Sequence, residues 1–199
     1  MCSISDLKCE GVGAPLQVRI IRKWKNDIRR YETWYLAVDR FGDAIQILGQ
    51  RTGQAYIESV FKLFDCYTIS EYSCPELDRH QKVLENDFYI EVGLISVIKQ
   101  LPDTMTIPKH WFRFVTKSHL MELGEKPPYY PDFIGVLSKI KDCRKQDDEP
   151  YVFLLLTDTG TLRHGSSPAT HVYINPEIPE TTALLDMYDV FLIYNHQIS

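Results

Sequence analysis

Hydrophobic and polar residues alternate with a period of two through much of the first half of the chain. The alternation is clearest in residues 17–25, 33–39 and 44–48. In the first stretch, Val18, Ile20 and Trp24 share one parity while basic residues dominate the other. A period of two predicts strands with one buried face.

Turn and helix signals between these stretches give the order of the elements. Gly42 and Asp43 predict a tight hairpin between the second and third strands. Residues 53–64 change to helical spacing and predict one short amphipathic helix, after which residues 66–72 and 87–92 return to alternation. This order follows the OB-fold, a five-stranded barrel with one helix after the third strand. A small antiparallel sandwich would alternate similarly, but the position of the helix favours the barrel.

The second half of the chain follows a stretch rich in proline, residues 101–131, where regular structure is repeatedly interrupted. Inside this stretch, the apolar run 111–115 is expected to pack against one of the domains. Strands are then predicted at residues 132–140, 151–156 and 171–174, with a turn at 157–167 and a helix at 181–195. Three strands are too few to close a barrel.

We therefore expect an all-β protein with short helices, in which an OB-fold barrel precedes a second, truncated OB-like domain. The expected divisions are an N-terminal extension (1–15), a first OB-fold domain (16–101), a Pro-rich linker (102–131) and the truncated domain with its C-terminal helix (132–199).

Composition and charge narrow the class of protein. The chain has 199 residues, of which 44% are hydrophobic and 25% are charged, as in soluble globular proteins. A formal net charge of −5 excludes a strongly basic nucleic-acid binder, although it permits a local basic groove. Without an apolar leader or a run near the ~20 residues that span a bilayer, an intracellular protein is expected.

The cysteines and histidines predict neither a metal site nor a cofactor. The five cysteines are widely spaced, form no CxxC pair and have no cluster of histidines beside them. Such spacing favours reduced thiols over a disulfide framework or structural zinc.

No catalytic centre is predicted either. Asp158, Thr159 and Gly160 spell the aspartic protease triplet, but it occurs once and lies in an expected turn, whereas that protease needs two carboxylates. His164 and His171 are not expected to have a catalytic nucleophile beside them, and there is no Gly-rich phosphate loop. The chain is expected not to be an enzyme.

The strongest candidate for binding chemistry is a basic stretch. Six of the twelve residues from Arg19 to Arg30 are basic, and only Asp27 opposes them. They fall on the first strand and the loop after it, which in an OB-fold lines one side of the binding groove. The alternative is a solvated charged strand with Trp24 buried in the barrel.

Several segments resemble the large subunit of replication protein A, and most closely its plant branch. Residues 21–26 (IRKWKN) resemble the first strand and loop of one of its OB domains, and residues 34–39 and 45–46 fit the next two strands. Residues 130–136 (YPDFIGV) and 173–180 (YINPEIPE) resemble the beginning and end of the following OB domain.

This resemblance implies a nuclear protein with tandem OB domains that binds single-stranded DNA. It assigns first-strand contacts to Arg22, Lys23, Trp24 and Lys25, and a flexible basic loop to Arg29 and Arg30. The family's stacking aromatics, however, would fall near residues 49–50, 80–81 and 159, where this chain has no bulky aromatic residue.

Because stacking is worth about 1–3 kcal/mol per base, weak binding through local basic residues is expected. The alternative is an OB-fold protein–protein interaction adaptor that has lost most nucleic-acid affinity. A protein partner, or self-association, would then use the truncated second domain and helix 181–195, because open strand edges invite pairing.

Overall fold

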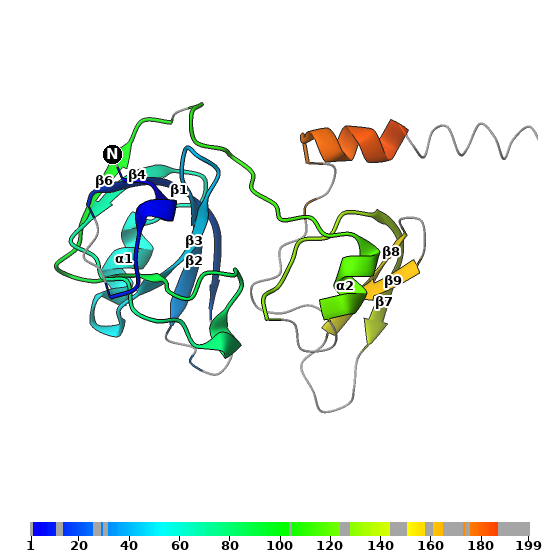
Figure 1. Ribbon diagram of the computed structural model, residues 1–199, viewed down its shortest axis with the longest axis horizontal. Coiled ribbons are helices and arrows are strands. Elements are labelled where there is room, and N and C mark those ends of the chain that lie inside the picture. The colour runs from blue at the N-terminus through cyan, green and yellow to red at the C-terminus, as the bar shows by residue number, and fades with distance from the viewer. Residues whose placement is uncertain are drawn as a thin grey trace, which may run out of the picture. The chain divides into compact units, whose positions relative to one another are not determined.

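The computed structural model contains two compact units, Met1–Pro131 and Asp132–Ser199 (Figure 1). It describes residues 2–10, 14–25, 29, 32–103, 105–123, 128–143, 151–157, 161–164, 173 and 176–186. No helix within these ranges combines the length and the hydropathy that crossing a membrane requires.

The first unit is built on a curled six-stranded sheet with the order β5-β3-β2-β1-β4-β6. Only the β3–β5 pair is parallel. The strands are β1 (Leu16–Lys25), β2 (Thr33–Val38), β3 (Ala44–Gly49), β4 (Cys66–Ser70), β5 (Ile90–Val92) and β6 (Val97–Leu101), and the helix α1 (Gln54–Val60) follows β3.

Strands β5 and β6 are two halves of one OB-fold strand. They are separated in the chain only by residues 93–96, yet they occupy opposite ends of the sheet order. One half pairs with β3 and the other with β4, so the sheet curls back on itself. The first unit therefore has the predicted OB-fold. Strand β6 was not predicted, because its sequence Val-Ile-Lys-Gln-Leu does not alternate between hydrophobic and polar residues and three of its five residues are exposed.

The barrel core is filled by alternate residues of the first four strands and by the end of α1. Phe61, the residue after α1, packs edge-on against Tyr35 and Tyr67, with ring centroids 5.1 Å apart in both pairs. The aliphatic part of this core includes Leu16, Val18, Ile20, Ala37, Ile45, Ile47, Ile57 and Ile69.

A bulge in β1 makes the prediction that Val18, Ile20 and Trp24 share one buried face wrong. The register of β1 against β2 shifts between Ile20 and Arg22, so Ile20 pairs with Ala37 but Trp24 pairs with Trp34. Since directly opposed residues share a face, Trp24 lies on the face opposite to Ile20. We call this second face, away from the barrel core, the outer face.

The hairpin between β2 and β3 forms as predicted. The Asp39 amide donates to the Asp43 carbonyl at 3.0 Å, and Gly42 takes a φ of +84°, which favours glycine. The Asp39 carboxylate also accepts from the amide of Ile4 at 2.8 Å, at the start of the 3-10 helix η1 (Ile4–Asp6). One buried carboxylate thus joins the N-terminal turn to the hairpin.

The second unit contains a three-stranded antiparallel sheet, β7-β8-β9. Its strands are β7 (Val136–Cys143), β8 (Tyr151–Thr157) and β9 (Thr161–His164). The strands expected at 132–140 and 151–156 correspond to β7 and β8, whereas the turn expected at 157–167 is wrong over β9. Residues 179–186 are helical, which agrees with the start of the helix expected at 181–195. Residues 158–160 and 187–199 lie outside the described residues.

A buried guanidinium attaches the segment after β6 to the barrel. The side chain of Arg19 is 1% exposed and donates to the carbonyl of Phe64 at 2.5 Å. It also donates to the carbonyl of Ile107 at 3.1 and 3.2 Å and to the carboxylate of Asp103 at 2.8 Å. The hydrogen bond from Arg19 lowers the pKa of Asp103. Together the contacts bring Asp103 and Ile107 back against β1.

Replacing Arg19 by alanine is expected to destabilise the first unit by about 2–4 kcal/mol, because two carbonyls lose a charged donor in a buried site. Urea unfolding followed by tryptophan fluorescence measures this change. The exposed Lys99→Ala on β6 is the matched control and is expected to change stability by less than about 0.5 kcal/mol. An Arg19→Ala protein that unfolds at the wild-type urea midpoint would contradict the structural role.

Candidate nucleic-acid interface

The basic stretch predicted to bind nucleic acid is divided between the two faces of β1. Lys23 pairs with Tyr35, a core residue, and therefore points to the core side near the barrel end. Arg22 pairs with Leu36 and Trp24 with Trp34, which places both on the outer face.

On the outer face, Arg22 and Trp24 are covered. Arg22 is 6% exposed, donates to the carbonyl of Trp111 at 3.3 Å and lies 5.8 Å from the ring centroid of Phe112. Trp24 is 9% exposed and stacks on Trp34 with centroids 6.5 Å apart. The guanidinium of Arg22 and the ring of Trp24 are therefore buried and not open to a ligand in solvent.

Lys23 and Lys25 meet a carboxylate at the barrel end. The ammonium of Lys23 lies 5.7 Å from the Tyr35 ring centroid, and that of Lys25, on a side chain 59% exposed, lies 3.8 Å from Glu58 Oε1. Glu58 also accepts hydrogen bonds from the Thr33 hydroxyl and, at 2.8 Å, from the Gln54 amide. These hydrogen bonds, with the two lysines, lower the pKa of Glu58.

The loop after β1 repeats this pairing of charges. Arg29 is 58% exposed and makes an ion pair with Glu32 at 3.1 Å. Both lie near Tyr89, whose ring packs edge-on against Trp34 at 5.1 Å. Burial, helped by nearby carboxylates, raises the pKa of Tyr89 to about 12. Arg30, the remaining predicted contact, lies outside the described residues.

The outer face of β2 and β3 is buried as completely as the core. Every residue of both strands is buried, including Leu36 and Val38 at 0% exposure. The prediction of one buried face for these strands is therefore wrong, because other segments of the chain cover the second face.

The loop between β4 and β5 covers β3 through Gln46. This side chain, 1% exposed, donates to the carbonyl of Gln81 at 3.0 Å. Its own carbonyl oxygen accepts from the amides of Val83 and Leu84 at 2.7 and 3.3 Å. In an OB-fold, this loop and the outer face of the second and third strands form the ligand-binding region.

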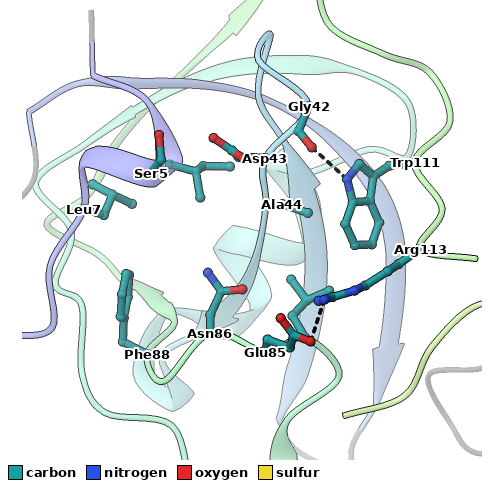
Figure 2. Close-up of a pocket in the computed structure, with 12 residues that line it drawn as sticks. Ser5, Leu7, Gly42, Asp43, Ala44, Glu85, Asn86, Phe88, Trp111 and Arg113 are labelled. Atoms are coloured by element: carbon teal, nitrogen blue, oxygen red, sulfur yellow. Dashed lines mark hydrogen bonds and ion pairs between the residues drawn. The ribbon is translucent and has the colours of Figure 1, made fainter. Parts of the chain in front are cut away.

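Residues 107–115, which we call the strap, cover the outer face from the other side. Besides accepting from Arg22, Trp111 donates its indole N–H to the Gly42 carbonyl at 2.8 Å (Figure 2). Arg113 makes an ion pair with Glu85 at 2.5 Å. The expectation that the run 111–115 packs against a domain agrees with these contacts.

A pocket of about 440 Å³ opens between the hairpin, η1, residues 84–88 and the strap. Figure 2 shows Asp43 and Asn86 on opposite sides of this space, with Trp111 and Arg113 along one edge. Two carboxylates, Asp43 and Glu85, face a single guanidinium there, so the pocket is unfavourable for phosphate. Within the described ranges, no group of three or more metal-ligating side chains comes together.

The OB-fold is also what comparison with known proteins shows. No protein-family model and no curated protein sequence match the chain. It is similar to a solved replication protein A heterotrimer bound to ssDNA, with a TM-score of 0.58 and 18% identity over 95% of this chain. The chain spans 55% of the length of that relative, and at this identity the likeness concerns the fold alone.

Two further solved structures are similar over part of the chain. An OB domain from Methanosarcina mazei matches with a TM-score of 0.39 and 18% identity, over 54% of this chain and 90% of that one. Schizosaccharomyces pombe Pot1pC bound to ssDNA matches with a TM-score of 0.41 and 8% identity, over 54% and 89% of the two chains.

Replacing Gln46 by leucine is expected to loosen the loop that covers β3, because two buried amides lose their acceptor. The expected cost in stability is about 1–3 kcal/mol. Hydrogen exchange should show faster exchange of the Val83 and Leu84 amides in this variant. The exposed Gln100→Leu serves as control, and equal protection of the two amides in both variants would refute this role of Gln46.

Proposed function

We propose that this chain is a non-enzymatic, nuclear single-stranded DNA-binding protein of the replication protein A large-subunit type. The observation that carries the proposal is the pair of exposed cations, Lys25 and Arg29, where β1 of an OB-fold leads into its first loop. That loop is one of the two that bind oligonucleotides in OB-folds. The resemblance of residues 21–26 and 130–136 to the replication protein A large subunit supports the same conclusion.

The residues predicted to contact DNA fall into two groups by their exposure to solvent. Lys25 and Arg29, with Arg30 of the same loop, are assigned to phosphate, because their charges can reach a strand lying on the surface. Arg22, Lys23 and Trp24 are more deeply placed and hold β1 in position beneath them.

Binding is expected to be weak and sensitive to salt. Each exposed cation has an internal competitor for phosphate, Glu58 for Lys25 and Glu32 for Arg29. The net charge of −5 provides no long-range attraction to DNA.

Replacing both Arg29 and Arg30 by alanine is expected to weaken binding to a labelled oligothymidine. Each lost phosphate contact should flatten the plot of log affinity against log salt by about 0.7, which gives about 1.4 for the pair. Fluorescence anisotropy over a salt series measures the slope. An unchanged slope would remove these arginines from the interface, and no binding at low salt would refute the proposed function.

Replacing Glu58 by glutamine is expected to strengthen binding, because the amide keeps hydrogen-bonding capacity for Thr33 and Gln54 but no longer attracts Lys25 as a charge. If Lys25 then contacts phosphate, the salt slope should steepen by about 0.7. The exposed Glu71→Gln removes the same charge elsewhere and is the control. Equal gains in both variants would mean that net charge alone is responsible.

A second candidate is a protein–protein interaction adaptor. The observation in its favour is the outer face of β2 and β3, which the chain's own loop and strap already occupy. A pull-down from nuclear extract alongside the anisotropy experiment separates the two: this candidate predicts specific capture of a protein with no binding of oligothymidine. The partner surface proposed for it is the second unit with helix 181–195.

A further inference from the structure

The strap lies in a second basic stretch of this acidic chain. From residue 104 to residue 121 there is no aspartate or glutamate, while Lys109, Arg113 and Lys117 are present with two histidines. Aromatic residues interleave with these cations in the run His-Trp-Phe-Arg-Phe at 110–114. Cations alternating with flat rings are typical of surfaces that bind single-stranded nucleic acid.

Three rings of the strap lie nearly parallel in a row. The centroids of His110 and Phe112 are 6.1 Å apart with an angle of 14° between the planes, and those of Phe112 and Phe114 are 5.1 Å apart with an angle of 13°. The guanidinium of Arg22 lies 5.8 Å from the centroid of the middle ring.

The intervening residues anchor the strap on the barrel. Trp111 donates to the hairpin at Gly42, and Arg113 binds Glu85 in the loop that covers β3. The alternate residues 110, 112 and 114 contact one another, and Phe112 also lies beside the guanidinium of Arg22 on β1. The strap is therefore attached to the barrel through Trp111 and Arg113 and, at the middle of the row of rings, through Phe112.

These rings remain partly accessible, unlike the strands beneath them. Every residue from 108 to 116 is half-buried or exposed, whereas β2 and β3 are buried throughout. Bases cannot reach the covered strands without moving the strap. The positions where the resemblance would place stacking aromatics, near Gly49 and Gln81, also carry no Phe, Tyr or Trp.

We infer that the strap is a base-stacking platform, on which the rings of His110, Phe112 and Phe114 bind unpaired bases of a single-stranded nucleic acid. Lys109, whose side chain is 57% exposed, lies beside this row in the sequence and is assigned to phosphate, for which it would exchange its 3.7 Å ion pair with the carboxylate of Asp103. Only unpaired bases offer free faces, so duplex DNA is not a ligand for this platform. This inference rests on the proposed function and assigns that function its stacking residues.

The test compares three full-length variants by anisotropy with labelled oligothymidine and, in parallel, oligouridine. Phe112→Leu with Phe114→Leu keeps apolar volume but removes both rings, and binding is expected to weaken about tenfold or more. The salt slope should stay unchanged, since no phosphate contact is lost. Phe112→Tyr with Phe114→Tyr keeps the rings and should bind as wild type. Tyr56→Leu, which removes an exposed ring on α1, is the control and should also bind as wild type.

A second measurement uses the unmodified protein, so that it does not depend on the folding of any variant. An oligonucleotide carrying 5-iodouracil, irradiated in the complex, should cross-link to the rings in residues 110–114, as mapped by mass spectrometry. Cross-links confined to residues 22–30 would overturn the inference while leaving the proposed function intact.

The remaining outcomes are also decisive. Tighter binding by the leucine variant would show that the strap covers the binding face instead of forming it, and unchanged binding would show that its rings only pack. Either result overturns the inference alone. A wild-type protein that binds neither oligonucleotide at low salt overturns the proposed function, and the inference with it.

Discussion

The burial of Arg19 is the constraint on which the rest of the first unit depends. A guanidinium that is 1% exposed is tolerated only when its donors are satisfied. Its acceptors come from Phe64, two residues before β4 begins, and from Asp103 and Ile107 in the segment after β6. The chain leaving the barrel must therefore return to β1, and this return starts the strap on the side of the sheet where an OB-fold receives its ligand.

The strands could be predicted because their side chains alternate. Which face of each strand packs into the barrel core could not be predicted. Trp34, Leu36 and Val38 form an apolar row in the sequence, yet the barrel core takes Tyr35 and Ala37 from the same strand. Period two identifies a buried row without saying what buries it. Here the row lies under the loop and the strap, whose anchors join residues as far apart as Arg19 and Ile107 through backbone carbonyls. Such contacts leave no pattern in the sequence.

The place of the basic stretch in the fold could be predicted but the exposure of its side chains could not, and its role in binding stays a prediction. Arg19, Arg22, Lys23 and Lys25 lie on β1 and Arg29 in the loop after it, and burial and ion pairs leave Lys25 and Arg29 as the most exposed of these five charges. The strap was missed as a binding element because its aromatic run suggested packing. The signal that could have found it is the absence of acidic residues from 104 to 121.

The bulge divides β1 into two parts whose side chains alternate in opposite phase. Before Ile21 the even-numbered residues enter the core, and after it the odd-numbered ones take the core side. If the same residues formed a regular strand without the bulge, every residue after Ile21 would take the other face, turning Trp24 toward the barrel interior and Lys23 toward the strap. The backbone conformation at the bulge, rather than the alternation of residue types alone, therefore decides which side chains of β1 enter the core.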